Sequence, residues 1–253
     1  MDLYTSYFNA KSFDRQIEID ASIVANLRNE NFKKVYVFTE EDCNLNKRYD
    51  FSKDRLVEIK ISRIPTYKDW IDFTVWNKSE ISIFCNSDIS FDDSINFSKK
   101  HILKEKSVLC LSLHEKERPW WSQDTWGLSL DNAKNISFLS DLNIEIGNVR
   151  CDNKFAYYFS FNEWDIYNPC HSIKSYHKHR SDIRSYSKKD PVNLENIALV
   201  FPCENEPSKI MYSFVPLSLK NVVGIEIAPY MIEGMEKEDF DLFENKMNFY
   251  KDF

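Results

Sequence analysis

Short apolar runs bounded by polar residues recur through the first part of the chain. Runs of this length and composition are typical of strands that are buried on both faces of a sheet. The second and the fourth run end abruptly in acidic side chains. The four runs lie at residues 2–8, 33–42, 56–62 and 80–89.

Two segments between these runs have helical periodicity. Apolar side chains recur at helical spacing from Ile17 to Leu27 within residues 13–29, and residues 65–78 form a second helical segment opened by a proline. The resulting order, β-α-β-β-α-β, predicts an α/β fold with a mainly parallel central sheet flanked by helices. In such sheets, ligands bind in the crevice beyond the carboxyl ends of the strands.

The pattern is less regular beyond the fourth strand. Residues 116–130 are rich in tryptophan and indicate a turn, and charge together with Pro191 interrupts the pattern near 188–192. We therefore expect one domain over residues 1–189 and a C-terminal extension over residues 190–253 that packs on this domain or on a partner. The other expected elements are helices near 94–103 and 135–141, strands at 107–113 and 172–179, and a helix returning to the sheet within 151–169.

Composition excludes several functional classes. Lys and Arg total 33 against 40 Asp and Glu, so the net charge of −7 does not attract the protein to nucleic acid. With only 4 glycines, the chain contains neither G-x-G-x-x-G nor G-x-x-x-x-G-K, which argues against dinucleotide and P-loop sites. The 6 cysteines form no C-x-x-C pair and suit buried thiols in a reducing compartment. Since no signal-peptide pattern and no apolar stretch of about 18 residues is present, we expect a cytoplasmic protein.

The fourth apolar run stops at an amide and a carboxylate. Its sequence ends in Asn86-Ser87-Asp88, and the chain then becomes acidic. A carboxylate at the tip of a buried strand must face solvent, pair with a cation or hold a metal ion, because burying an unpaired charge is costly. On its own, a strand-end cap is the simpler explanation of Asp88, since Asn and Asp are common where strands turn.

Two later positions change this interpretation. Asp152 stands just before an apolar helical segment, where free backbone N–H groups would fix its side chain. His177 ends an alternating strand further along the chain. Separately, Asp152 could be a helix N-cap and His177 a strand-end histidine. In this order, after the tip at residues 86–88, they match a more specific pattern.

The motifs resemble those of nucleotide-sugar glycosyltransferases with the GT-A fold. An acidic tip on a strand, an aspartate at a helix start and a tyrosine-histidine pair closing a late strand follow in the order of that family. More narrowly, the chain is similar to a less characterised branch of sugar transferases that resembles enzymes building bacterial surface polysaccharides. The stretches that carry the similarity are NSDISFDD, SQDTWG, RCDNKFAY and NPCHSIKSYHKHRSDIRSY, within residues 2–187.

The resemblance implies an inverting enzyme of the hexosyltransferase type. Asp152 would be its general base. The tip residues Asn86, Ser87 and Asp88 would bind the donor, a UDP-sugar. Asp88 and His177 would also hold Mn²⁺ or Mg²⁺, with His177 completing the donor site. The acceptor would be a glycan or a lipid-linked glycan.

Two positions depart from the family pattern. Asn86 replaces the first acid of an Asp-X-Asp tip, and Cys151 replaces the acid that often precedes the catalytic aspartate. One carboxylate binds a divalent cation less well than two, because hard cations gain most from anionic oxygens. An enzyme with little or no use of metal would offset the diphosphate charge with cationic side chains. The candidates are Arg15, Arg63, Lys174 and Arg184.

Further donor contacts are expected at the ends of the early strands. Thr5 and Glu40, at the carboxyl ends of the first two strands, lie where a nucleobase and a ribose would bind. Arg15 would also contact the donor. Arg63 and Tyr67, at the start of the second helix, complete this side.

The acceptor side is predicted around the tryptophan-rich segment. Asp124 could bind sugar hydroxyls and Trp126 could pack on a sugar ring. A core corner with a capping aspartate explains both residues as well. The other acceptor-side candidates are Lys174, His179 and Arg184.

Two other functions stay open. Asn86 and Cys151 are compatible with a sugar- or nucleotide-binding module that kept the fold without turnover. A Mg²⁺-dependent phosphohydrolase could use the same strand-tip carboxylates, although no phosphatase nucleophile motif is present. Release of UDP from a UDP-sugar, and its loss in Asp152→Asn, separates the transferase from both. Peripheral association with the inner face of the membrane and an oligomer formed through the aromatic-rich tail are also compatible with the sequence.

Overall fold

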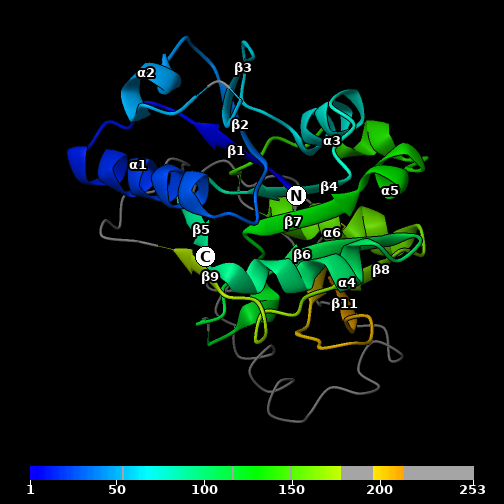
Figure 1. The fold of residues 1–253 in the computed structure, drawn as a ribbon. Coiled ribbons are helices and arrows are strands. Elements are labelled where there is room, and N and C mark those ends of the chain that lie inside the picture. The colour runs from blue at the N-terminus through cyan, green and yellow to red at the C-terminus, as the bar shows by residue number, and fades with distance from the viewer. Residues whose placement is uncertain (53, 116, 149, 178–195, 214–253) are drawn as a thin grey trace, which may run out of the picture.

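The computed structural model describes residues 1–52, 54–115, 117–148, 150–177 and 196–213, which are coloured in Figure 1. Its centre is a seven-stranded sheet with the strand order β3-β2-β1-β4-β7-β6-β8. Neighbouring strands are parallel except for β7, which is antiparallel to both β4 and β6. The strands are β1 (Asp2–Tyr7), β2 (Lys34–Thr39), β3 (Leu56–Lys60), β4 (Ile81–Cys85), β6 (Ser107–Leu111), β7 (Thr125–Ser129) and β8 (Asp165–Tyr167).

Two short antiparallel ladders lie outside this sheet. In one, β5 (Ile89–Phe91) pairs with β9 (Ser175–His177). In the other, β10 (Ile197–Val200) pairs with β11 (Ile210–Ser213). Of the strand predicted at residues 172–179, the described part Ser175–His177 pairs with β5 beyond the end of β4 and not with the central sheet.

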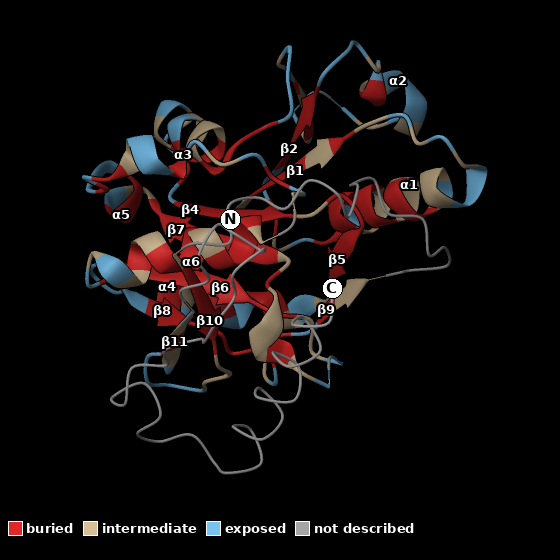
Figure 2. Cartoon of the chain, turned by 180° about the vertical axis from the view of Figure 1, so that it is seen from behind, coloured by how far each residue is buried: buried red, intermediate tan, exposed pale blue. Residues whose placement is uncertain are grey.

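Helices cover both faces of the central sheet (Figures 1 and 2). One face is covered by α1 (Phe13–Arg28), α2 (Leu45–Tyr49) and α4 (Lys99–Ile102). The other is covered by α3 (Tyr67–Trp76), α5 (Leu130–Lys134) and α6 (Cys151–Phe161). Three short 3₁₀ helices complete the described elements: η1 (Asp93–Ser98), η2 (Pro119–Trp121) and η3 (Leu139–Leu142).

Strand β2 shows why the apolar runs are nearly continuous. Val35 and Val37 join the buried cluster on the α1 face, whereas Tyr36 and Phe38 join the cluster that contains Trp70 of α3. Because both faces are covered, each position needs an apolar side chain. Full burial of one such side chain contributes about 1.5–3 kcal/mol.

Local capping decides where two of the helices begin. Thr66 and Asp69 form a capping box at α3, in which each side chain accepts a hydrogen bond from the backbone N–H of the other residue. Ser129 caps α5, because its hydroxyl accepts a hydrogen bond from Asn132 N at 3.1 Å. The helix predicted near 135–141 is therefore replaced by the earlier α5 and the short η3.

Strand β7 differs most from the predicted pattern. Residues 116–130, expected to form a turn, contain this strand in the middle of the sheet. A Cβ atom on Gly127 would lie 2.6 Å from Cδ1 of Ile102 and 2.9 Å from Cδ1 of Ile83. The glycine therefore allows α4 to pack closely over the centre of the sheet.

The β10–β11 hairpin packs against α6. Ala198 and Val200 belong to the same buried cluster as Phe155 and Phe159 of α6. Nδ2 of Asn153 donates a hydrogen bond to the carbonyl oxygen of Ala198 at 3.1 Å. This hairpin is the described part of the predicted C-terminal extension, and the boundary near 188–192 stays a prediction. None of the helices in the described part of the chain combines the length and the apolar character that a membrane span requires.

Candidate active site

Asp88 lies in the turn between β4 and β5, at the carboxyl edge of the sheet. Its Oδ2 atom is 2.6 Å from Nη1 of Arg15 and 2.6 Å from Nε2 of His177. Arg15 belongs to the first turn of α1, where the hydroxyl of Ser12 accepts a hydrogen bond from Arg15 N. His177 is opposite Ile89 in the β5–β9 ladder, so this ladder brings its imidazole to the neighbouring carboxylate.

The Asp88 carboxylate is buried and ionised. Only 4% of the residue is exposed. Burial is the largest influence and favours the neutral form, but the hydrogen bonds and charges of His177 and Arg15 outweigh it and lower the pKa of Asp88 to about 2. Nη1 of Arg15 also lies 2.9 Å from Oε2 of Glu18, so one guanidinium nitrogen serves two carboxylates.

Two buried asparagines, Asn26 in α1 and Asn29 at its C-cap, hold β5 beside Asp88. Nδ2 of Asn26 donates to the carbonyl oxygen of Ile89 at 2.8 Å, and its Oδ1 accepts from Phe91 N at 3.3 Å. Nδ2 of Asn29 donates to the carbonyl oxygen of Phe91 at 3.1 Å. These side chains satisfy backbone groups on the edge of β5 that faces α1. Helix α1 therefore positions Asp88 in two ways: Arg15 contacts its carboxylate, and Asn26 holds the adjacent strand β5.

Asn86 and Asp124 form a second polar pair at the same edge. Cys85 and Thr125 are partners in the β4–β7 ladder, so the residues just beyond them face each other. Nδ2 of Asn86 donates to Oδ1 of Asp124 at 3.0 Å, and Asn86 N donates to the carbonyl oxygen of Asp124 at 3.0 Å. Both residues are half-buried. The amide that replaces an acid at this tip thus holds the carboxylate of the SQD motif.

Asp152 lies in the first turn of α6, beside the same SQD motif. Its Oδ2 atom accepts a hydrogen bond from Gln123 N at 2.9 Å, and only 8% of the residue is exposed. Burial is the largest influence and raises the pKa of Asp152, while the Gln123 hydrogen bond and the charge of Arg150 oppose it. A carboxyl group with a raised pKa exchanges a proton closer to neutral pH, as a general base requires.

The three residues of the predicted site therefore gather at one edge of the sheet. Asp88 and His177 are in direct contact. Asp152 accepts a hydrogen bond from Gln123, and the next residue, Asp124, accepts one from Asn86. Asn86 lies two residues before Asp88, so these contacts lead from Asp152 to Asp88. Strand register and the position of α6 create this proximity, because these groups are far apart along the chain.

Two predicted ligand contacts need correction. The rings of Tyr67 and Trp126 are both fully buried, with 0% exposure. Their centroids are 4.8 Å apart in an edge-on arrangement, and both rings also pack on Phe155 of α6. Neither ring offers a face to a donor or to a sugar. Tyr67 instead supports the start of α6, where its hydroxyl lies 3.6 Å from Sγ of Cys151.

Three donor-side candidates lie at the carboxyl edge of the sheet but do not contact Asp88. They are Thr5, Glu40 and Arg63. The hydroxyl of Thr5 is buried and donates to the carbonyl oxygen of Cys85 at 3.0 Å, so it is used within the sheet. Glu40 is exposed just beyond the end of β2. The guanidinium of Arg63 contacts both carboxylate oxygens of Asp69, at 2.5 and 2.7 Å, at the start of α3.

The remaining candidates divide into three cases. Ser87 is buried beside Asp88. Lys174 is exposed, and its backbone N donates to Oγ of Ser94 at 2.7 Å, which places it beyond the end of the β5–β9 ladder that is remote from Asp88. His179 and Arg184 lie outside the described residues.

Two residues beside the predicted acids were not among the candidates. Arg150 precedes α6, and its guanidinium carbon lies 4.5 Å from the centroid of the Trp121 ring. Gln123 has a buried side-chain amide that finds no hydrogen-bond partner among the described residues. The only signal in the sequence was their position next to Asp124 and Asp152 in the quoted motifs, because stacking and amide burial have no sequence pattern of their own.

The strand-tip residues do not fit a divalent cation. No group of three or more His, Cys, Asp or Glu side chains arranged for a metal occurs among the described residues. The two predicted ligands, Asp88 and His177, contact each other, and Arg15 contacts the same carboxylate oxygen. A cation would have to displace the Arg15 guanidinium, which already supplies the positive charge between Asp88 and Glu18, and would have to break the contact between Asp88 and His177. No catalytic step at Asp88 and His177 is therefore assigned to a metal ion.

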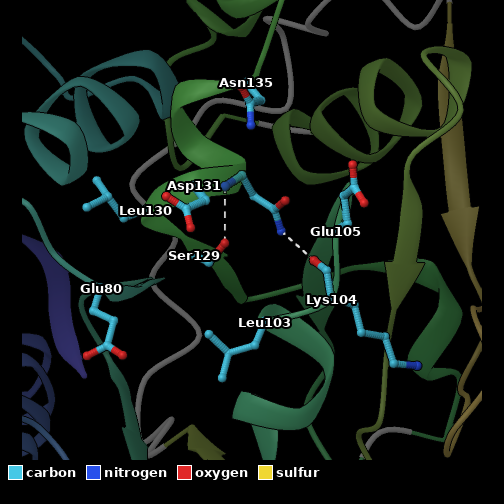
Figure 3. A pocket seen from close by; sticks show the side chains of 9 residues that line it. Glu80, Leu103, Lys104, Glu105, Ser129, Leu130, Asp131 and Asn135 are labelled. Atoms are coloured by element: carbon cyan, nitrogen blue, oxygen red, sulfur yellow. Dashed lines mark hydrogen bonds between the residues drawn. The ribbon is translucent and has the colours of Figure 1, made fainter.

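An open cavity of ≈ 570 Å³ lies at the opposite edge of the sheet (Figure 3). It is lined by Glu80 before β4 and by Ser129 at the end of β7. None of the predicted site residues lines it. Asn132, on its wall, already donates to the carbonyl oxygen of Lys104 at 2.8 Å. This cavity is separate from the strand-tip site.

Comparison with known proteins shows a likeness in fold. The sequence matches no family model and no curated protein. GalNAc-T7 with UDP, GalNAc and Mn²⁺ resembles the chain with a TM-score of 0.51 at 6% identity, over 77% of this chain and 46% of that chain. S. aureus TarS in complex with UDP-GlcNAc gives 0.49 at 13% identity, over 77% and 62%. The mannosyltransferase PcManGT from Pyrobaculum calidifontis, in complex with GDP-Man and Mn²⁺, gives 0.48 at 9% identity, over 66% and 54%.

These structural neighbours are glycosyltransferases with the GT-A fold. The chain has an α/β architecture like that of GalNAc-T7, with a seven-stranded, mostly parallel sheet between layers of helices, and the predicted fold class is confirmed. It spans between 46% and 62% of the length of the three proteins. The narrower branch indicated by the four motifs stays a prediction.

Proposed function

We propose that the protein is an inverting glycosyltransferase that moves a sugar from a nucleotide diphosphate donor to an acceptor hydroxyl. One observation carries this proposal: two carboxyl groups at one edge of the sheet have pKa values shifted in opposite directions. The pKa of Asp88 is lowered beside Arg15 and His177, and the pKa of Asp152 is raised by burial. Such a separation is typical of a site in which one group carries charge and another exchanges a proton.

The donor diphosphate would bind on the Asp88 side. Both ion pairs of Arg15 use Nη1, so within the described residues its Nε and Nη2 groups are available to phosphate oxygens. His177 could donate a further hydrogen bond, and Asn86 could bind the sugar or the ribose. A UDP-sugar donor is supported by the resemblance of the motifs, and UDP is the nucleotide named in the GalNAc-T7 structure.

Asp152 would act on the other side of the transferred sugar. It takes the proton of the acceptor hydroxyl while the oxygen attacks the anomeric carbon. The bond between that carbon and the diphosphate oxygen breaks, and the diphosphate leaves with the electron pair. The configuration at the anomeric carbon is inverted, because attack and departure occur on opposite faces. We infer a hexose donor and a glycan or lipid-linked glycan acceptor from the motif resemblance.

The test measures donor binding and UDP release separately. The protein and Asp152→Asn are incubated with a panel of UDP-hexoses and glycan acceptors. Asp152→Asn should reduce UDP release by about 10²–10⁴-fold with UDP affinity unchanged. The control is Asp141→Asn, an exposed carboxylate in η3, which should not alter release. Activity should also fall on the acid side as Asp152 takes up its proton, at a pH above the usual range for an aspartate.

Each outcome separates the alternatives. UDP binding without release from any donor by the unmodified protein would favour a binding module. Absence of UDP binding would overturn the proposal. Because the donor set at Asp88 does not fit a divalent cation, UDP binding should persist in EDTA. Binding is therefore measured both in EDTA and with added MnCl₂.

A further inference from the structure

Arg150 occupies an unusual position at the start of α6. Its backbone is left-handed, with φ of 67°, immediately before the helical residues that include Asp152. The guanidinium carbon lies 4.5 Å from the ring centroid of Trp121, and Nη1 donates to Oδ1 of Asn153 at 3.1 Å. Asn153 is itself anchored, because its Nδ2 donates to the carbonyl oxygen of Ala198. The guanidinium is therefore held in place from two sides.

The charge of Arg150 has no acidic partner in the part of the chain that the structure describes. By contrast, Arg15, Arg48 and Arg63 each form an ion pair with Asp or Glu. Among the described residues, the Arg150 guanidinium contacts the Trp121 ring and the neutral amide of Asn153. An immobilised, half-buried guanidinium with unused N–H groups suits bidentate binding of a carboxylate or a phosphate.

The proposed reaction geometry puts Arg150 on the acceptor side of the transferred sugar. In an inverting displacement the attacking hydroxyl and the departing diphosphate lie on opposite faces of the sugar. Asp152 would accept the proton of the hydroxyl, and the Asp88 cluster would face the diphosphate. Arg150 stands two residues before Asp152, and its charge acts on that carboxyl group. A group bound by Arg150 would therefore lie next to the acceptor hydroxyl.

We propose that Arg150, held by Trp121 and Asn153, binds an anionic group of the acceptor, so that the substrate class is an acidic glycan bearing a carboxylate or a phosphate. This inference rests on the proposed function, in particular on Asp152 as the general base. A neutral acceptor would leave the Arg150 guanidinium without an anionic partner among the described residues. A guanidinium binds carboxylate and phosphate groups in a similar way. Acceptors that carry one or the other, each compared with its neutral counterpart, show which group is bound.

The experiment compares sugars that differ only in charge. With the donor site saturated by UDP, binding is measured by calorimetry for p-nitrophenyl glucuronide against p-nitrophenyl glucoside, and for glucose 6-phosphate against glucose. The unmodified protein should bind at least one anionic sugar about tenfold more tightly than its neutral counterpart, the gain expected from one charge-assisted pair. The pair that shows the preference identifies the source of the charge.

Variants test whether Arg150 causes the preference. Arg150→Gln should abolish it, and Arg150→Lys should retain part of it, because lysine keeps the charge but loses the planar fork. Affinity for UDP should stay unchanged in both. The control is Arg28→Gln, an exposed arginine in the last turn of α1, which should keep the preference.

Two results would overturn the inference. One is equal binding of charged and neutral sugars by the unmodified protein. The other is an Arg150→Gln variant that weakens both members of a pair equally, as expected if Arg150 only supports the start of α6. Failure of the proposed function is distinguishable, since it would appear as absence of UDP binding in the unmodified protein before any sugar is added.

Discussion

Asp88 and Asp152 have the same side chain and different surroundings. Asp88 is in contact with Arg15 and His177, so its charge is stabilised inside the protein. Asp152 receives a backbone hydrogen bond from Gln123 but no ion pair within the described residues, so burial has the larger effect on its pKa. The opposite pKa shifts of the two carboxyl groups follow from these contacts.

The stability contributed by Asp88 depends on pH in a definite direction. Its pKa in the folded protein, about 2, is below the unfolded value, so the stabilisation is present above about pH 4 and is lost as pH falls through about 2. Asp88→Asn should therefore lower the free energy of unfolding at pH 7 by about 2 kcal/mol, and by less at pH 3. Urea denaturation at both pH values measures the difference.

The control for this prediction is Asp141→Asn, which changes an exposed carboxylate. It should leave the free energy of unfolding within about 0.5 kcal/mol of the unmodified protein at both pH values. A loss in Asp88→Asn that is equally large at pH 3 and pH 7 would contradict the assignment of the ion pair as its cause.

The strand tip depends on the docking of α1 against β5. Asn26 bonds to one carbonyl oxygen and one N–H group of β5 from within a helix, in the manner of a neighbouring strand. The same helix supplies Arg15, and β5 pairs with the strand that supplies His177. One helix and one short ladder thus determine how Arg15, Asp88 and His177 meet.

Replacing Asn26 should disturb both stability and the site. Asn26→Leu leaves the Ile89 carbonyl oxygen and the Phe91 N–H group buried without their partner, which should cost about 2–4 kcal/mol in the free energy of unfolding. Because Asp88 immediately precedes β5, UDP affinity should fall as well. Denaturation and calorimetry measure the two effects.

The exposed Asn143 provides the matched control. Asn143→Leu makes the same chemical change on the surface and should alter neither the free energy of unfolding nor UDP affinity appreciably. An Asn26→Leu variant as stable as Asn143→Leu would show that β5 does not need this side chain.

The β10–β11 hairpin makes the predicted domain boundary testable. Ala198 and Val200 lie in the core with α6, and Trp120 stacks on Phe201 with centroids 5.5 Å apart. A chain truncated to residues 1–189 would expose the α6 surface that these residues cover. We expect it to unfold at lower urea concentration than the full chain, or to aggregate, because it loses part of a shared core.

The full chain is the reference for this truncation, and fluorescence-monitored urea unfolding is the measurement. Val200→Ala in the full chain, a smaller loss in the same cluster, should lower the free energy of unfolding by about 1–3 kcal/mol. A 1–189 chain that unfolds at the same midpoint as the full chain would show that the hairpin contributes nothing to the core.

Much of the fold could be predicted from the sequence because its causes are local. The apolar runs of β1, β2, β3 and β4 and the periodicity of α1 and α3 reflect burial of side chains along each element. Elements whose boundaries depend on distant contacts were less predictable. The segment at 116–130 contains a central strand in which Gly127 leaves room for Ile102 of α4, and no local pattern encodes that contact.

For the candidate site, the sequence alone determined the residue types and their order: an amide and an acid after β4, an acid at the start of α6 and a histidine ending β9. Only the tertiary structure decided which of them meet. Strand register placed Asn86 against Asp124, α1 brought Arg15 to Asp88, and packing turned the rings of Tyr67 and Trp126 into the core. The physical reason is that periodicity reports how each element faces its surroundings, whereas contact between elements depends on register and packing between residues that are distant along the chain.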